Sequence, residues 1–239
     1  MNWLSYPRAL IMVALYPFVL WFFSVFCILQ NLLFNRRDWD DAVVRAWGRV
    51  SCAMFGVKVK VEGRENLPAG GCIFLFNHSS FFDIFTMAAV FPGLRYGAKI
   101  ELFRIPVFGF AMRRVGILPI DRGRREKTFG VYREAHDRLE KGERFALAPE
   151  GTRQDEERLG PFKAGPFVFA INTGAPVVPL VIKNASRIMP KHSLFPNWGV
   201  WSREVRLIIL PPVSATDYVL KDRPQLQERV RRDMQPYLS

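Results

Sequence analysis

A long stretch without charge near the N-terminus limits what this chain can fold into. Residues 9–35 contain no charged side chain, whereas Arg8 precedes them and Arg36 and Arg37 follow. A helix over this stretch would be roughly 40 Å long at about 1.5 Å per residue, which exceeds the hydrocarbon core of a bilayer. The stretch is too long for the apolar part of a signal peptide, and Pro17 should kink it. The core helix of a soluble domain is the alternative, but such helices rarely run this far without a charge. We therefore expect a membrane-associated helix.

A second helix is predicted directly after the first, beginning near Asp38 and ending at Gly56. Arg45 and Arg49 lie on one side of it, which makes the helix amphipathic with a basic face, as at a membrane surface. Residues 1–56 should thus form a two-helix membrane-associated hairpin. The sequence leaves open whether the first helix crosses the bilayer or enters one leaflet. The apolar face is expected to hold Val43, Trp47, Val50 and Met54.

Residues 57–239 are predicted to form an α/β domain with a mixed, largely parallel sheet flanked by helices. Short segments typical of strands, either apolar throughout or alternating apolar and polar, alternate along the chain with longer segments typical of helices. This order is typical of α/β domains. We expect strands at 57–61, 73–76, 94–98, 116–120, 144–148, 177–182 and 205–210, and helices at 81–90, 105–115, 127–141, 162–173 and 224–234.

The charge balance favours anionic partners. The chain of 239 residues has a formal net charge of +12, which suits lipid headgroups, nucleotides, acidic proteins or nucleic acid. Nucleic acid is disfavoured because the sequence has no helix-turn-helix, zinc-finger or RNP-type signature. The three cysteines match no zinc motif, and their odd number argues for reduced thiols.

One short motif has the composition of a catalytic base with an orienting carboxylate. The apolar run Cys72–Phe76 reads as a buried strand, and His78 follows it, at the position where open α/β sheets carry their chemistry. Asp83 lies five residues further on, so the two side chains meet only if the chain turns between them and a helix begins near Phe81. His78 and Asp83 could then act as base and orienter. Alternatively, Asp83 belongs to an ordinary capping box that begins at Ser80.

Three further clusters place a cation near the end of a predicted strand. Lys99, Arg122 and Arg153 could together bind a phosphate, and Gly151 would let the backbone approach a ligand closely. Each cluster taken alone also fits a surface turn with a solvated charge. Because no serine or cysteine has the context of a nucleophile, the base would act directly on a substrate hydroxyl. A membrane-resident alcohol that carries a phosphate is the natural acceptor.

From about residue 59 to residue 212 the sequence resembles the glycerophospholipid acyltransferases, and most closely the 1-acyl-glycerol-3-phosphate acyltransferases. Four blocks of residues match the family's pattern, in the same order along the chain. They are Asn77, His78 and Asp83; Lys99, Glu101, Leu102, Pro106, Gly109 and Gly116 to Arg122; Pro149 to Arg153; and Val178, Pro179 and Leu180. The third block departs from the pattern at its two ends, where Ala148 replaces the usual Phe and Gln154 the usual Ser.

This resemblance implies a reaction and a set of roles. His78 would take the proton from the sn-2 hydroxyl of lysophosphatidic acid, which attacks the thioester of acyl-CoA or acyl carrier protein without a covalent enzyme intermediate. Asp83 would orient and stabilise the imidazole. No metal or cofactor is expected. The enzyme would be membrane-associated, with its catalytic domain facing the cytoplasm. The phosphate ligands would be Lys99, Arg122 and Arg153, and the glycerol site would comprise Glu150, Gly151 and Thr152.

Two alternatives stay open at the level of sequence. One is acylation of another lysolipid, or a transacylase that uses a phospholipid donor. The other is a basic protein that binds anionic membrane or nucleic acid without catalysis. The stretch Lys183–Glu204 mixes aromatic residues with cations, which fits a membrane interface, a dock for CoA or a carrier protein, or a solvated loop.

Overall fold

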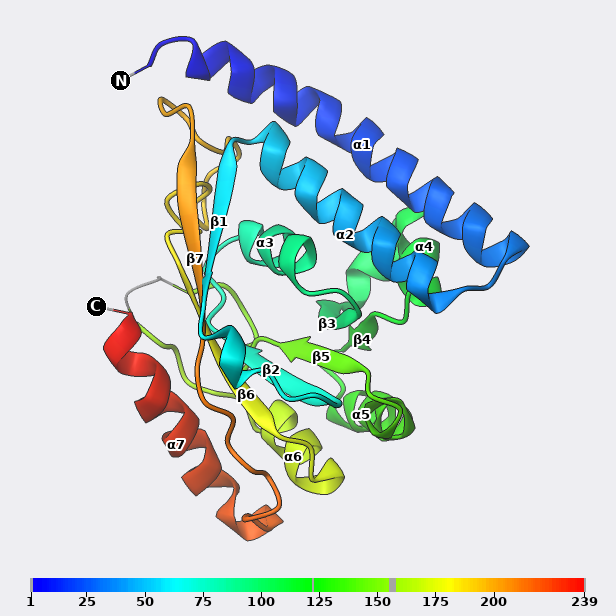
Figure 1. Cartoon of the computed structure of the whole chain (residues 1–239), viewed down its shortest axis with the longest axis vertical. Helices are drawn as coiled ribbons and strands as arrows, with labels where there is room; N and C mark the ends of the chain where they lie inside the picture. Colours follow the sequence, from blue (N-terminus) through cyan, green and yellow to red (C-terminus); the bar gives the residue numbers. More distant parts are fainter. Residues whose placement is uncertain (1, 122, 155–157, 239) are drawn as a thin grey trace.

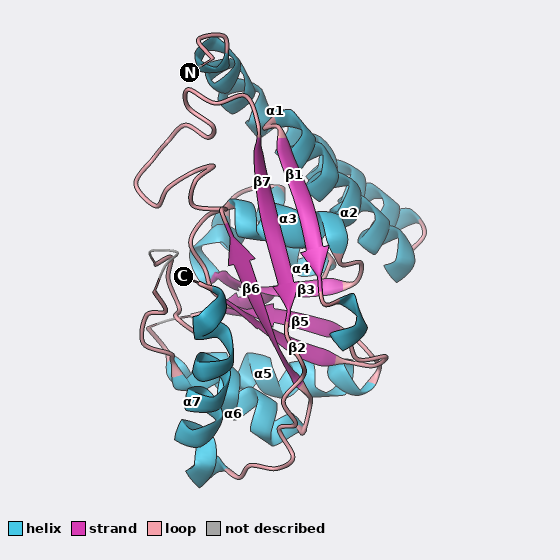
Figure 2. Cartoon of the chain, turned by 60° about the vertical axis from the view of Figure 1, so that its left-hand side comes forward, coloured by secondary structure: helices cyan, strands magenta, loops and turns pink. Residues whose placement is uncertain are grey.

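The structure is a computed structural model, and it describes residues 2–121, 123–154 and 158–238. Within these ranges seven strands form one sheet in the order β1-β7-β6-β2-β5-β3-β4 (Figure 2). The strands are β1 (Val57–Glu62), β2 (Cys72–Phe76), β3 (Leu94–Lys99), β4 (Leu118–Ile120), β5 (Arg144–Leu147), β6 (Val177–Lys183) and β7 (Arg203–Ile209). The α-helices are α1 (Ser5–Leu33), α2 (Arg37–Met54), α3 (Phe82–Val90), α4 (Phe108–Arg114), α5 (Arg125–Glu140), α6 (Ala164–Thr173) and α7 (Arg223–Met234), with a 3-10 helix η2 at Ile100–Arg104.

The predicted mixed, largely parallel sheet is confirmed. The pairs β1–β7, β6–β2, β2–β5, β5–β3 and β3–β4 are parallel, and the one antiparallel strand pair described is β6–β7. The carboxyl ends of β2, β3, β4, β5 and β6 therefore lie along the same edge of the sheet. The loops that follow these strands carry the residues singled out in the sequence.

Both faces of the sheet are buried, which explains why β2 is a continuous apolar run. Along β2, Phe74 and Phe76 pack on one side with α3, while Ile73 and Leu75 pack on the other side with α5 and α6. Helices α1, α2 and α3 lie together on one side of the sheet, and α6 and α7 lie on the other (Figure 1).

The two predicted N-terminal helices form an antiparallel hairpin, and α2 lies between α1 and α3 (Figure 1). Of the predicted apolar face of α2, Val43 is buried and Trp47 and Met54 pack against the core, but Val50 is exposed. The close approach to α3 is made at Gly48. A Cβ atom at Gly48 would lie 2.6 Å from the backbone nitrogen of Ala89, so the absence of a side chain lets α2 approach α3 closely.

Much of the outer side of α1 is apolar and exposed. Among the described residues, α1 is the one helix whose length and composition would allow it to cross a membrane. Side chains such as Phe18, Trp21 and Phe22 are more than half exposed, whereas few residues of the helix are buried. A soluble protein rarely exposes so much contiguous apolar surface, so α1 is a candidate membrane-associated helix.

One predicted helix is broken. The segment 105–115 contains only α4, because Pro106 has no backbone N–H to donate and Val107 takes a φ of +63° just before the helix. The strand expected at 116–120 is shortened to β4, because Gly116 ends the helix with a φ of +80°.

Candidate active site

The end of β2 is fixed by the side chain of Asn77, which makes the pair of hydrogen bonds to β6 that a strand backbone would make. The Asn77 side chain donates to the carbonyl oxygen of Ile182 at 2.9 Å and accepts from the Ile182 amide at 2.7 Å. This buried side chain therefore ties the end of β2 to β6 and sets where the next residue, His78, leaves the sheet.

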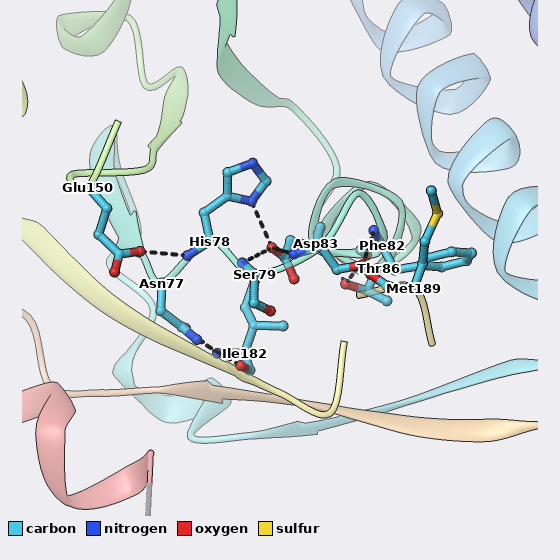
Figure 3. Close-up of polar contacts among 10 residues, drawn as sticks. Asn77, His78, Ser79, Phe82, Asp83, Thr86, Glu150, Ile182 and Met189 are labelled. Carbon is cyan, nitrogen blue, oxygen red and sulfur yellow. Dashed lines mark hydrogen bonds and ion pairs between the residues drawn. The ribbon is translucent and has the colours of Figure 1, made fainter. Parts of the chain in front are cut away.

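His78 and Asp83 meet because the chain turns between them before α3 begins at Phe82 (Figure 3). His78 Nδ1 donates to Asp83 Oδ2 at 2.7 Å, and the same oxygen accepts from the backbone amides of Ser79 and Ser80 at 2.8 and 2.9 Å. Asp83 is fully buried in the first turn of α3. One carboxylate thus orients the imidazole and also binds the backbone ahead of the helix. Only half of the predicted capping box forms, because the Asp83 amide donates to the Ser80 carbonyl at 3.3 Å, while the Ser80 hydroxyl donates to the carbonyl of Met189. The other ring nitrogen of His78, Nε2, faces away from Asp83 (Figure 3).

The backbone of His78 is held on both sides by the loop that follows β5. Its N–H donates to Glu150 Oε2 at 3.0 Å, and its carbonyl accepts from the Gln154 amide at 2.7 Å. Glu150 Oε1 accepts from the Gly160 amide at 2.7 Å. Glu150 is buried, and this burial raises the pKa of its carboxyl above the ordinary value of 4.5, although the two amides act in the opposite direction.

The same loop is held from its other side by α7. Arg231 donates to the carbonyl oxygen of Leu159 at 3.0 Å and to the carbonyl oxygen of Gly160, and its guanidinium carbon lies 4.5 Å from the centre of the Phe162 ring. A chain of contacts therefore leads from Arg231 through Gly160 and Glu150 to the backbone of His78. No pattern in the sequence indicates these contacts, because Arg231 is one of several arginines on a polar helix.

A cavity of about 430 Å³ opens beside His78. Its polar side is formed by His78, Lys99, Thr152 and Arg153, and the rest of its wall is largely apolar. The walls come from four helices and the β3 region, which no local pattern could have identified. They include Leu20, Phe23 and Cys27 of α1, Val43, Val44 and Trp47 of α2, Ile84 of α3, and Phe108, Ala111 and Met112 of α4.

Two of the three predicted cations border this cavity. The Arg153 guanidinium lies over Phe81, with its carbon 4.3 Å from the ring centre, and its buried Nη1 has no hydrogen-bond partner in the part of the chain that the structure describes. Lys99 is half-exposed, and its Nζ lies 3.4 Å from Glu101 Oε1. The third cation, Arg122, lies outside the described residues.

The remaining predicted residues lie in the turn between Glu150 and Arg153. Thr152 lines the cavity, and Gly151 has a φ of +73°, a conformation that favours glycine. The carboxylate of Glu150 points to backbone amides and does not line the cavity. The structure thus brings His78, Asp83, Lys99, Thr152 and Arg153 together and sets Glu150 behind them as a support.

An oriented imidazole beside an apolar cavity with a cationic rim defines a class of site. It suits removal of a proton from a substrate that is apolar at one end and anionic at the other. Residues 58–183 match the family model described as Acyltransferase. The chain therefore belongs to the acyltransferase family.

Individual relatives point the same way. The chain is 35% identical over 187 residues to the chloroplastic 1-acyl-sn-glycerol-3-phosphate acyltransferase BAT2 of Brassica napus, covering 76% of this chain and 53% of that one. It is 33% identical over 217 residues to the 1-acyl-sn-glycerol-3-phosphate acyltransferase of Saccharomyces cerevisiae, covering 88% and 69%. The chain thus spans about half the length of the Brassica relative.

A solved structure shares the fold. The crystal structure of the 1-acyl-sn-glycerophosphate (LPA) acyltransferase PlsC from Thermotoga maritima superposes with a TM-score of 0.76 at 25% identity, covering 94% of this chain and 92% of that one.

Proposed function

We propose that this chain moves a fatty acyl group from a thioester donor, acyl-CoA or acyl carrier protein, to the sn-2 hydroxyl of lysophosphatidic acid, which gives phosphatidic acid. The observation that carries the proposal is His78, oriented by Asp83 and bordering an apolar cavity whose rim holds Arg153. The relatives in Brassica napus and Saccharomyces cerevisiae, both named as 1-acyl-sn-glycerol-3-phosphate acyltransferases, support the choice of acceptor.

The reaction follows from the orientation of the imidazole. Nδ1 is engaged by Asp83, so Nε2 is the basic nitrogen and takes the proton of the acceptor hydroxyl. The hydroxyl oxygen forms a bond to the thioester carbonyl carbon, and the carbon–sulfur bond then breaks. The leaving thiolate takes the proton from the imidazolium, which returns His78 to its starting state. Asp83 stabilises the imidazolium between these two transfers.

The two ends of the acceptor are matched by the two kinds of surface around His78. Arg153 and Lys99 are placed to bind the phosphate, and an arginine can do so through two parallel hydrogen bonds. The apolar wall between α1, α2 and α4 is suited to an acyl chain. Glu150 acts on this site indirectly, by holding the backbone of His78.

The membrane is the proposed source of the acceptor. Helix α1 lies along α2 and α4, so it cannot stand upright across a bilayer unless these helices enter it as well. We therefore place α1 in one leaflet, with its exposed apolar side towards the hydrocarbon. The net charge of +12 favours the anionic cytoplasmic leaflet, so the catalytic part would face the cytoplasm.

Release of thiol from acyl-CoA tests the proposal. Purified protein in mixed micelles should release thiol when lysophosphatidic acid is present and should form phosphatidic acid in equal amount. His78→Ala should lose about 10²–10⁴-fold or more of this activity, while His136→Ala, a partly buried histidine of α5 that does not line the cavity, should keep it. Faster turnover with a lysolipid of another headgroup would move the proposal to that acceptor. Full activity of His78→Ala would exclude the proposed base.

A further inference from the structure

We propose that the end of the molecule beside the N-terminus of α1 is a second lipid-contact surface, which binds the headgroup region of an anionic bilayer. This surface, the aromatic cap, consists of Trp3, Leu194, Trp198 and Trp201. The inference rests on the membrane association proposed above, but not on the acyl-transfer chemistry.

The aromatic cap exposes large apolar side chains that come from distant parts of the chain. Trp3 is 72% exposed and Leu194 is 77% exposed, while Trp198 and Trp201 are 46% and 49% exposed. The first belongs to the segment before α1, and the other three belong to the loop between β6 and β7. Figures 1 and 2 both show this loop beside the N-terminal end of α1.

The aromatic cap is built into the fold rather than carried on a free loop. The ring centres of Tyr6 and Trp198 lie 4.8 Å apart, and the guanidinium carbon of Arg8 lies 4.2 Å from the centre of the Trp201 ring. Arg8 also donates to the carbonyl oxygens of Trp201 and Met54, and the Asn2 amide donates to the Gly199 carbonyl at 3.3 Å. The loop is therefore bound to the N-terminal segment and to α1, and Arg8 links it further to the end of α2.

The base of the loop is anchored in the interior. The Asn197 amide donates to the Ile188 carbonyl at 2.7 Å, and the buried Asn197 side chain donates to the Phe55 carbonyl. These contacts fix the backbone at the base of the loop, while Leu194 stays exposed and the ring of Trp198, packed against Tyr6 and Phe195, stays about half exposed. Exposed apolar side chains on a fixed backbone are typical of a contact surface.

The chemistry of the loop points to a lipid surface. Residues 184–202 contain no Asp or Glu, and Arg187 and Lys191 are both exposed. Tryptophan together with Arg and Lys is the composition of the membrane–water interface, and cations near an anionic surface add attraction. The cap also continues the exposed side of α1, which includes Ile11 and is preceded by the exposed Leu4. A bilayer that covers α1 would therefore meet the aromatic cap at the same depth as the end of the helix.

An environment-sensitive fluorophore at position 194 tests this inference directly. The native cysteines Cys27, Cys52 and Cys72 are buried, so Leu194→Cys can be labelled in the chain of 239 residues, with the unsubstituted chain measuring the background. Leu220→Cys is the matched control, because Leu220 is also an exposed leucine but lies before α7 at the opposite end of the molecule (Figure 1).

Vesicles of phosphatidylcholine, with or without phosphatidylglycerol, are the probe, and no substrate is present. We expect the label at position 194 to shift to the blue and to be quenched by lipids that carry a quencher near the headgroup, more strongly with phosphatidylglycerol. The label at position 220 should keep its aqueous spectrum. In flotation, Leu194→Glu should partition about 10-fold or more weakly than Leu220→Glu.

Three results would overturn the inference. One is an aqueous spectrum at position 194 in a protein that floats with vesicles. Another is a shift that acyl-CoA or acyl carrier protein causes without vesicles, which would make the cap a donor dock. The third is a shift that depends only on protein concentration, which would make it a contact between two copies. None of these results bears on thiol release. The proposal of acyl transfer would therefore remain valid if the proposal for the aromatic cap were overturned.

Discussion

The backbone N–H of His78 donates a hydrogen bond of 3.0 Å to the carboxylate of Glu150, which follows a different strand. The proposed base is thereby held by its backbone as well as by its side chain. Its imidazole is oriented by Asp83, while its main chain is fixed by the loop after β5. The position of Nε2 relative to Arg153 thus depends on two loops that are joined to each other, and separate substitutions can test each connection.

Replacement of Asp83 by Asn should impair catalysis far more than folding. An Asn side-chain oxygen can still accept from His78 Nδ1 and from the backbone amides of Ser79 and Ser80, so the shape of the turn is retained. The negative charge that stabilises the imidazolium is lost. We expect kcat to fall about 10²–10⁴-fold with a small change in melting temperature. A variant that loses stability but keeps its kcat would show that Asp83 serves only the helix start.

Arg153→Ala should weaken the binding of lysophosphatidic acid and leave the binding of acyl-CoA unchanged. The Arg153 guanidinium lies over Phe81, and its buried Nη1 has no hydrogen-bond partner among the described residues. A phosphate oxygen of the acceptor can accept a hydrogen bond from this nitrogen. Loss of charge-assisted bonds worth about 1.5–3 kcal/mol should raise the KM for lysophosphatidic acid roughly 10- to 150-fold. Separate titrations of lysolipid and acyl-CoA measure this, with Arg229→Ala on α7 as control. An unchanged lysolipid KM would remove Arg153 from the phosphate site.

Arg231→Ala should weaken the binding of the acceptor, although Arg231 does not line the cavity. Arg231 holds the carbonyls of Leu159 and Gly160, and thereby the loop that carries Glu150 and Arg153. Two lost hydrogen bonds, together about 1–2 kcal/mol, should raise the KM for the lysolipid roughly 5- to 30-fold while the KM for acyl-CoA stays constant.

Two companions of Arg231→Ala separate positioning from general stability. Arg231→Lys can restore one of the two hydrogen bonds and should recover part of the effect, and Arg232→Ala, an exposed neighbour, should behave like the parent chain. If the KM values for both substrates rose equally and the melting temperature fell at the same time, Arg231 would only stabilise the packing of α7.

Glu150→Gln should change how stability depends on pH. Burial raises the pKa of Glu150 in the folded chain above 4.5, so the folded state holds this proton more tightly than the unfolded state. Ionisation of Glu150 therefore lowers the free energy of unfolding as pH rises from 4.5 through the raised folded-state pKa. The glutamine side chain of the variant cannot ionise, so this decline should be shallower in the variant.

Melting temperatures in detergent micelles, measured from weakly acid to neutral pH, check the prediction for Glu150. Glu140→Gln is the control, because Glu140 is largely exposed and should leave the decline as it is. A decline of the same steepness in Glu150→Gln and the parent chain would mean that Glu150 ionises as easily in the folded state as in the unfolded one.

The sequence predicts most strands and helices because their signals are local. The run Cys72–Phe76 is apolar at every position, and a sheet covered on both faces requires this. The close contact at Gly48 leaves no signal in the sequence, because glycine is not apolar, although its small size is what lets α2 approach α3. The break before α4 leaves none either, because valine has no preference for the positive φ that Val107 adopts.

The candidate site divides in the same way. His78 and Asp83 are close in sequence, so their contact could be predicted from one turn. Arg231 and the cavity wall of α1 come from the two ends of the chain, and their roles exist only after the sheet has formed. Residues that act through backbone carbonyls leave no motif, because any backbone can supply a carbonyl oxygen.

Helix α1 has a consequence for how a substrate chain would be held. One side of it, including Phe23 and Cys27, lines the cavity, while another side, including Phe18 and Trp21, is exposed. In a leaflet, the wall between cavity and hydrocarbon would be a single helix thick. An acyl chain gains about 0.8 kcal/mol per CH₂ on leaving water, but it gains almost no free energy on moving from the hydrocarbon of the leaflet into the apolar cavity. The headgroup would therefore supply nearly all of the affinity, and a product would not be retained by the length of its own tail.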